Sequence, residues 1–271
     1  MCAIAVRRSK AFLYRTKRNI NEQMIGGVKP STPVKTVVAI MYLDPVTGHN
    51  MPRCSGTVIE NMWVVTAGHC FPDDSLANIT IVAGEMDLGA YYGGYSTRAR
   101  TIQPKNVYKP ENYLRIPKKA LDNDLALVEL VESLEVSENA FIEAAALPPP
   151  GMKIIGEEFQ VVGWGKTGKY SDMSPALLSI QIPINQDNDC RRTHGENKYF
   201  PHRMFCGGMK NKTTCNGDSG GGAIFHGWDV PVILGVVSFG KDNDKEKCKS
   251  STVYTKISAF LPWIFELTKI K

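Results

Sequence analysis

Short runs of β-branched and aromatic residues, separated by Gly, Pro, Asn and Asp, recur along the chain from Val34 onward. Such runs between turn residues are typical of β-strands. In the first half of the chain we expect strands at Val37–Leu43, Thr57–Ile59, Trp63–Thr66, Ile79–Val82 and Leu125–Leu130. In the second half we expect them at Phe159–Trp164, Leu178–Ile184, Met204–Cys206, Ala223–Phe225, Val232–Phe239 and Val253–Ile257. Short, regularly spaced strands predict an all-β sandwich or barrel rather than βαβ units.

A proline-rich stretch, Leu147-Pro-Pro-Pro-Gly151, divides the two sets of strands. Consecutive prolines cannot join a sheet ladder, so we expect a connector between two halves. A C-terminal helix is expected over about residues 258–269, because Ser258 can cap its N-terminus and apolar residues follow at helical spacing. These apolar residues are Phe260, Trp263, Ile264 and Leu267.

Residues 1–23 lack apolar periodicity and contain the basic cluster Arg15–Arg18. A segment of this kind is exposed to proteases, so we expect a leader or pro-segment ahead of a domain at 24–271. The leader holds six Lys and Arg against one Glu, which accounts for the whole net charge of +5 and leaves the remainder neutral. A nucleic-acid-binding protein carries its positive charge on the folded domain, so no nucleic-acid partner is expected.

The composition of the 271 residues, 43% hydrophobic and 22% charged, permits a large buried core. No apolar run approaches the roughly 20 residues that a membrane-spanning helix needs, so no membrane partner is expected. The apolar start Cys2–Val6 is shorter than the core of a signal peptide. Secretion therefore has to be inferred from other features.

The cysteines are the first of these features. There are seven, at Cys2, Cys54, Cys70, Cys190, Cys206, Cys215 and Cys248. No two form a C-x-x-C pair, which weakens zinc-ribbon and thioredoxin-type interpretations and favours disulfides. The Asn-x-Thr sequons at Asn78 and Asn211 are also compatible with an oxidising, secretory route. We therefore expect a secreted, extracellular glycoprotein.

The segment Thr213–Gly222 contains a candidate nucleophile, Ser219, among four glycines. A serine hydroxyl needs a base within hydrogen-bond reach and donors for the oxyanion that it creates. Gly217 and the glycines after Ser219 permit a tight turn whose backbone N–H groups point at a carbonyl oxygen. A Gly-rich surface turn would contain the same residue types, so the assignment depends on partners elsewhere in the chain.

Two segments supply candidate partners. His69 lies in Val64-Val-Thr-Ala-Gly-His-Cys70, directly after an apolar strand and beside a cysteine. Asp124 lies in Asp122-Asn-Asp-Leu-Ala-Leu-Val128, where a carboxylate precedes an apolar strand and is drawn toward the interior. Taken singly, such a histidine is more often structural, and such an aspartate is usually a turn residue.

Together, and in the order His, Asp, Ser, these segments resemble the chymotrypsin/trypsin family of serine endopeptidases, whose chain order differs from that of subtilisins and α/β-hydrolases. The resemblance extends over 24–271. Met24-Ile-Gly-Gly27 is similar to the activated N-terminus of the family, Val161–Gly165 to its mid-chain strand, and Ser238–Gly240 to its substrate-binding strand.

The fold that this resemblance implies is all-β, with two six-stranded antiparallel β-barrels, the active site in the cleft between them and the C-terminal helix. The barrels would span about residues 34–143 and 152–257. The resemblance also implies a catalytic triad, in which Ser219 attacks a peptide carbonyl, His69 transfers the proton and Asp124 orients His69. The N–H groups of Gly217 and Ser219 would form the oxyanion hole.

An activation step is implied as well, in which cleavage ahead of Met24 creates an α-ammonium that pairs with Asp218 and orders the oxyanion hole. Most family members have Arg or Lys before the cleaved bond and Ile or Val after it, whereas this chain has Gln23 and Met24. Cleavage after Arg18 would leave five surplus residues ahead of Met24. We therefore expect a zymogen that a non-tryptic protease activates, or that activates itself.

Family spacing implies the disulfides Cys54–Cys70, Cys190–Cys206 and Cys215–Cys248. Cys2 is left over; it tethers the leader to another domain, pairs between chains or remains free.

Cleavage preference is implied by the position of Thr213, which falls at the base of the specificity pocket, where trypsin-like members have Asp. Arg and Lys are therefore disfavoured in the substrate. Ser238 and Gly240 would line the pocket, Gly240 leaving its mouth open and Thr252 filling its depth, which suggests small to medium uncharged side chains. An acid from the loop Lys241–Lys247 could still reach the pocket, although a solvated charge run is the favoured interpretation.

Glu85 is similar to a calcium-loop ligand of some relatives, but the segment Leu88–Tyr95 offers no further carboxylate. We expect no strong calcium site, no other metal and no cofactor. The tyrosines of that segment form either a partner-binding surface or part of the barrel packing.

These features predict a secreted serine endopeptidase, made as a zymogen, that hydrolyses protein or peptide substrates in a limited-proteolysis cascade. Its expected partners include an activating protease and serpin-type inhibitors. The alternative is a catalytically silent homologue that serves as a binding scaffold.

Overall fold

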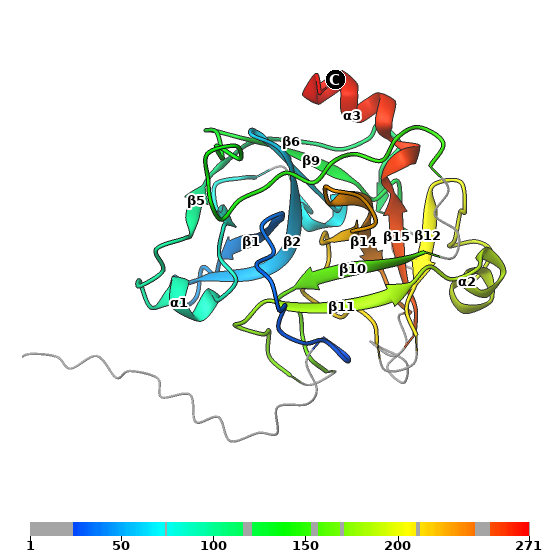
Figure 1. The fold of residues 1–271 in the computed structure, drawn as a ribbon, viewed down its shortest axis with the longest axis horizontal. Helices are drawn as coiled ribbons and strands as arrows, with labels where there is room; N and C mark the ends of the chain where they lie inside the picture. The colour runs from blue at the N-terminus through cyan, green and yellow to red at the C-terminus, as the bar shows by residue number, and fades with distance from the viewer. Residues whose placement is uncertain are drawn as a thin grey trace, which may run out of the picture.

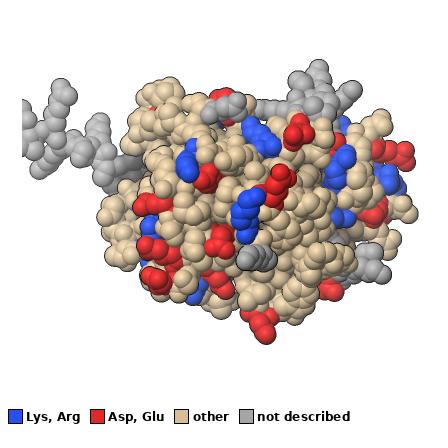
Figure 2. Space-filling model, turned by 90° about the horizontal axis from the view of Figure 1, so that it is seen from above, with Lys and Arg blue, Asp and Glu red and all other residues tan. Residues whose placement is uncertain are grey.

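A computed structural model describes residues 24–73, 75–115, 121–152, 157–168, 171–209, 212–241 and 250–270 of the chain (Figure 1). Two curled antiparallel sheets make up most of the regular structure, and the chain passes from the first sheet to the second and ends in a helix. Within the described ranges, no helix is long and apolar enough to cross a membrane. Acidic and basic side chains are interspersed over much of the face seen in Figure 2.

The first sheet closes on itself. Its strands, in the order in which they pair, are β5 (Arg100–Ile102), β4 (Ile79–Ala83), β1 (Val37–Leu43), β2 (Asn50–Glu60), β3 (Trp63–Thr66), β9 (Ala126–Leu130) and β6 (Pro104–Tyr108). The edge strands β5 and β6 are separated in the chain only by Gln103, so one continuous segment pairs at both edges. Counted as continuous segments, the barrel has six members, and closure leaves no long unpaired edge.

The second sheet is closed by a short contact between its ends. The strands pair in the order β11 (Leu178–Pro183), β10 (Glu158–Gly163), β13 (Gly222–Phe225), β14 (Val232–Phe239), β15 (Thr252–Lys256) and β12 (Met204–Gly207). Ile184, just after β11, forms a bridge with Gly207 of β12, and the Asn185 N–H donates to the Cys206 carbonyl oxygen at 2.9 Å. Two antiparallel barrels confirm the predicted fold class.

The remaining elements are short. β7 (Leu114–Arg115) and β8 (Leu121–Asp122) form a separate two-stranded ribbon. The helices are α1 (Leu88–Tyr92), α2 (Asp187–His194) and α3 (Leu261–Thr268). Although α3 follows the second barrel in the chain, its Leu261 and Ile264 belong to the apolar core of the first barrel, so the helix ties the two halves together.

Strand β1 shows why the barrels pack against each other. Its first five residues are all buried, which differs from the alternation of a half-exposed strand. Val38 and Ile40 point into the core of the first barrel, whereas Val37 and Ala39 pack in a cluster that also contains Trp164 of the second half. Successive side chains point to opposite faces of a strand, so both faces of β1 are apolar because both are covered.

Most predicted strands are confirmed to within one or two residues, but Thr57–Ile59 is only the end of the longer β2. The sequence pattern did not indicate β5 to β8, α1 or α2. β5 and β6 are rich in polar residues, and β6 begins with Pro104. α2 is mostly polar and only eight residues long, so it has no recognisable apolar stripe.

The predicted start of the C-terminal helix is wrong. Ser258 lies in a short 3₁₀ turn, Ile257–Ala259, and α3 begins after Phe260, which makes no side-chain capping hydrogen bond. Pro262 stands in the first turn, where a missing N–H costs nothing and the ring favours helical backbone, so proline rather than a serine cap sets the start.

Candidate active site

His69 and Asp124 meet at one end of two paired strands. β3 pairs with β9 in a register that places Thr66 opposite Ala126, so the turn after β3 and the turn before β9 are neighbours. The Asp124 carboxylate accepts twice from His69, from its backbone N–H at 2.8 Å and at Nδ1, also at 2.8 Å. With Nδ1 held by this carboxylate, Nε2 is left as the basic nitrogen of the neutral ring.

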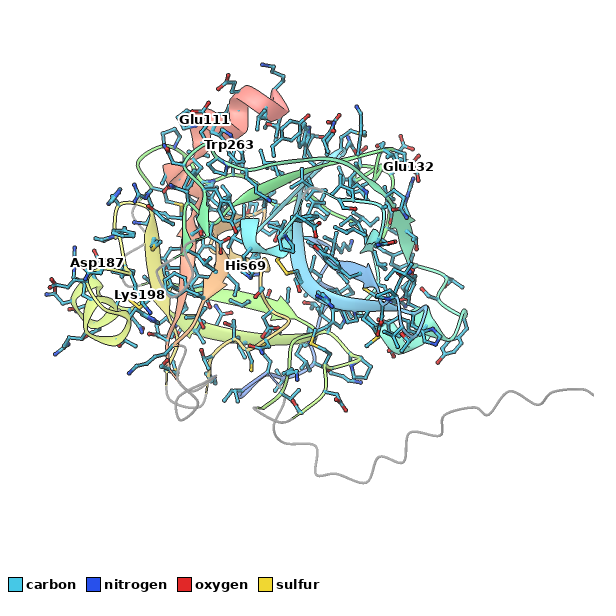
Figure 3. The ribbon with its side chains drawn as sticks, turned by 180° about the vertical axis from the view of Figure 1, so that it is seen from behind. His69, Glu111, Glu132, Asp187, Lys198 and Trp263 are labelled. Atoms are coloured by element: carbon cyan, nitrogen blue, oxygen red, sulfur yellow. A yellow bond between two sulfur atoms is a disulfide. The ribbon has the colours of Figure 1, made fainter. Side chains whose placement is uncertain are left out.

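The second barrel holds the same aspartate. The Ser238 hydroxyl of β14 donates to the Asp124 carboxylate at 2.5 Å, and the Thr255 hydroxyl of β15 donates to the Asp124 carbonyl oxygen at 2.8 Å. Asp124 is completely buried, whereas the His69 side chain keeps 20% of its surface exposed. His69 lies near the middle of the molecule in the view of Figure 3.

The Ser219 loop packs against the segments that carry the His69 turn. The Ser55 N–H of β2 donates to the Ser219 carbonyl oxygen at 2.8 Å. A Cβ on Gly220 would lie 2.1 Å from the Thr66 Oγ1 atom, so only glycine fits beside β3 at this position. Among the described contacts, no hydrogen bond joins the Ser219 hydroxyl to His69.

Gly217 could not be replaced by a larger residue without displacing its neighbours. Its φ is +97°, and a Cβ would lie 2.2 Å from Met173 Cε and 2.9 Å from Gly165 Cα. The left-handed region is easily accessible only to glycine. The backbone at Gly217 therefore has the freedom that the predicted oxyanion turn requires.

Asp218 is a fully buried carboxyl group. It accepts hydrogen bonds from the Gly165 N–H at 3.0 Å and the Cys215 N–H at 2.8 Å, and no cation among the described residues pairs with it. Burial raises the pKa of Asp218 to about 7, against the opposing effect of these two hydrogen bonds. A Cβ built on Gly163 would lie 2.4 Å from the Asp218 carboxylate and 3.4 Å from the Met24 Cε atom. The buried Met24 side chain and the Asp218 carboxyl group therefore both lie beside Gly163.

Thr213 lies in a buried cluster of hydroxyl groups. Its hydroxyl donates to the Ser250 carbonyl oxygen at 2.7 Å and lies 3.1 Å from the Thr252 hydroxyl, which is 2.7 Å from that of Thr214. Thr214 was missed by sequence reasoning, although its place next to Thr213 was a signal. Gly240, which is predicted to lie at the mouth of the specificity pocket, is exposed, and no described atom lies within 4 Å of a Cβ built there.

Two of the predicted disulfides are confirmed, Cys54–Cys70 and Cys190–Cys206. Cys215 is also disulfide-bonded. Its predicted partner Cys248 lies outside the described residues, as do Cys2, the glycosylation candidate Asn211 and the acids of the Lys241–Lys247 loop. The other glycosylation candidate, Asn78, is exposed.

The described residues bring together one group of potential metal ligands, Cys54, His69 and Cys70, whose ligand atoms lie within 4.8 Å of one another. The two sulfur atoms form a disulfide, so neither is available as a thiolate. The Glu85 carboxylate accepts from the Met86 N–H at 2.8 Å and the Asp87 N–H at 2.9 Å, and from the Ser96 hydroxyl. Both carboxylate oxygens of Glu85 therefore have partners within their own loop.

Comparison of the sequence with known proteins identifies a family. The Trypsin family model matches residues 34–264. The chain is 32% identical over 226 residues to a trypsin of Phaedon cochleariae, with 80% of this chain and 79% of that protein aligned. It is 29% identical over 230 residues to Trypsin-1 of Astacus astacus, covering 83% and 92%.

Two other relatives differ in extent. Phenoloxidase-activating factor 3 of Holotrichia diomphalia is 27% identical over 285 aligned positions, which cover 99% of this chain and 80% of that protein. Serine proteinase stubble of Drosophila melanogaster is 29% identical over 220 residues, and the aligned part is only 27% of its length. The chain belongs to the trypsin family of serine endopeptidases.

Proposed function

We propose that this chain hydrolyses peptide bonds through the triad Ser219, His69 and Asp124. The observation that carries the proposal is the fully buried Asp124 carboxylate on His69 Nδ1, next to a loop that presents a partly exposed serine. A carboxylate in this position holds the imidazole in the tautomer whose Nε2 accepts a proton, and stabilises the imidazolium that results.

The reaction proceeds in two halves. Ser219 Oγ attacks the carbonyl carbon while His69 Nε2 takes its proton, and His69 then protonates the leaving amine as the acyl-enzyme forms. In the second half, His69 takes a proton from a water molecule, whose oxygen attacks the acyl carbon. The bond between that carbon and Ser219 Oγ then breaks, the carboxylic acid product is released, and His69 returns the proton to Ser219. The N–H groups of Gly217 and Ser219 stabilise the oxyanion, each contributing on the order of 3 kcal/mol.

Activation by cleavage of the Gln23–Met24 bond is the second part of the proposal. The new α-ammonium of Met24 pairs with Asp218 and supplies the cation that this carboxylate lacks among the described residues. Support comes from the position of the Met24 side chain beside Asp218 and from the raised pKa of that group. A buried charge without a partner is strongly destabilising, so pairing favours the ordered active loop.

Substrate preference for small to medium uncharged side chains is the third part. The Thr213 hydroxyl already donates to a backbone carbonyl, and its described neighbours Thr214 and Thr252 are neutral. Among the described residues, a substrate Arg or Lys would find no carboxylate beside Thr213, and burying its charge there would be costly.

We further propose that the enzyme is secreted and acts in a limited-proteolysis cascade, with an activating protease and serpin-type inhibitors as partners. The similarity to Phenoloxidase-activating factor 3, whose name describes the activation of another protein, covers nearly the whole chain and supports this setting. The disulfides support an oxidising compartment.

A fluorophosphonate probe tests the triad. The activated wild-type protein should be labelled and should cleave peptides, whereas Ser219→Ala should not be labelled and should lose at least about a thousandfold in kcat, because no other group replaces the nucleophile. Ser75→Ala, which alters an exposed serine, is the control and should behave as wild type. Failure of the activated wild-type protein to label would favour the binding scaffold instead.

N-terminal sequencing of active enzyme tests the activation site. Active protein should begin at Met24, and trypsin should not generate it, because Gln23 is not a tryptic residue. Gln23→Arg should make trypsin an activator, with the same N-terminus and the same kcat as the native product. Active enzyme that begins at any other residue would contradict the proposal.

A peptide library tests the cleavage preference. Wild-type enzyme should cleave after small or medium uncharged residues. Thr213→Asp introduces a carboxylate at the bottom of the specificity pocket, so it should raise the ratio of kcat/KM for cleavage after Lys or Arg to kcat/KM for cleavage after uncharged residues by about tenfold. Ser75→Ala, which alters an exposed serine outside the pocket, should leave the ranking unchanged. Wild-type cleavage after Arg or Lys would show that another group, outside Thr213, sets the specificity.

The pKa of Asp218 makes the stability of the uncleaved chain depend on pH. A carboxyl group with a raised pKa in the folded state binds more protons folded than unfolded, so the free energy of unfolding falls as pH rises from about 4 to about 7. Denaturant unfolding at pH 5 and pH 8 measures this fall in uncleaved Ser219→Ala protein. Adding Asp218→Asn should reduce the fall by up to about 3 kcal/mol; an unchanged difference would mean that the carboxyl does not titrate in this range.

A further inference from the structure

One ion pair connects the segment of the proposed catalytic aspartate to the other barrel. Arg203, in the turn before β12, donates from a guanidinium nitrogen to the Asp122 carboxylate in β8 at 2.8 Å. The two residues are 81 positions apart, and Asp122 lies only two residues before Asp124. We propose that Arg203 is a positioning residue, which acts through Asp122 to hold Asp124 at the angle that His69 requires. The inference rests on the proposed triad.

The Asp122 carboxylate is shared between the ion pair and the backbone. One oxygen accepts from Arg203, and the other accepts from the Asn123 N–H at 2.9 Å. Asn123 has a left-handed backbone, with a φ of +53°, and its side-chain amide donates to the Asn112 carbonyl oxygen at 2.8 Å. A change at Asp122 therefore acts on the residue whose backbone directs the chain into Asp124.

The contacts around Arg203 and Asp124 form a closed ring. The Lys256 N–H donates to the Arg203 carbonyl oxygen at 2.8 Å, and the adjacent Thr255 donates its hydroxyl to the Asp124 carbonyl oxygen at 2.8 Å. The ring thus runs from Arg203 through Asp122 to Asp124, and returns through Thr255 and Lys256. Both ends of the Asp122–Asp124 segment are attached to the second barrel, one by a hydroxyl and one by the ion pair.

The guanidinium of Arg203 suits this role better than a lysine would. Its Cζ atom lies over the Phe200 ring, 5.2 Å from the ring centroid, and the side chains of Arg203 and Asp122 are only 29% and 21% exposed. A planar guanidinium has its donors in fixed directions, which a flexible ammonium lacks. A partly exposed pair contributes little to overall stability, but a displacement of about 1 Å near a reacting group can cost about a hundredfold in rate.

Kinetics of activated variants test the inference. Asp122→Asn and Arg203→Gln should each lower kcat about tenfold while KM stays within about twofold, because substrate contacts are unchanged and only the orientation of the catalytic base suffers. The double variant should be no slower than either single one. Arg203→Lys and the exchange Asp122→Arg with Arg203→Asp should recover part of the rate.

A matched control is Lys105→Gln, which removes an ion pair with Glu129 inside the first barrel at 2.7 Å and should leave kcat unchanged. Rates are expressed per active site, by fluorophosphonate titration, and Tm is measured for each variant. If kcat per active site remains within twofold of wild type in Asp122→Asn and Arg203→Gln, the pair only stabilises the fold and the inference is wrong.

Failure of the proposed triad gives a different result. Wild-type protein would then not be labelled at Ser219 at all, which overturns the triad and the positioning role together. A labelled, active wild type with unaffected variants overturns the positioning role alone.

Discussion

The burial of the Asp124 carboxylate is the constraint on which the rest of the site depends. A carboxylate without partners in an apolar interior is strongly destabilising. This one is satisfied by two groups of His69, from the first barrel, and by the Ser238 hydroxyl, from the second. Because these donors come from both barrels, they converge only when the barrels pack as they do. The Asp124 carboxylate therefore couples the relative position of the two barrels to the orientation of the His69 imidazole.

Two adjacent residues of β2, in the first barrel, contact the turn that carries His69 and the loop that carries Ser219. Cys54 is covalently linked to Cys70, the neighbour of His69, and Ser55 donates its N–H to the Ser219 carbonyl oxygen. The loop can approach this closely because Gly220 has no side chain to collide with β3. Glycine is thus required at this point for packing across the barrel interface, as well as for the turn itself.

Two buried side chains in the Thr213–Gly222 segment have opposite electrostatic consequences. Thr213 is neutral, and its hydroxyl is satisfied by a carbonyl oxygen and a neighbouring hydroxyl. Asp218 has two backbone donors but no cationic partner among the described residues, and burial raises its pKa to about 7. A segment of ten residues thereby contains one neutral, hydrogen-bonded side chain and one buried carboxyl group without a cation among the described residues.

Much of this protein was determined by the sequence itself. Most strands can be predicted from local sequence, because runs of β-branched residues between turn residues favour the extended conformation. The family motifs around His69, Asp124 and Ser219 identify the candidate triad. The start of α3 and the polar strands β5 and β6 were not readable, since proline geometry and pairing with neighbours decide them rather than an apolar pattern. Three further features were not readable either: the contact of Thr214 with Thr252, the Arg203–Asp122 pair and the closure of the first barrel at Gln103. The residues involved lie far apart in the chain or have no distinctive composition. Such contacts follow from how the two barrels close and pack, which only the tertiary structure decides.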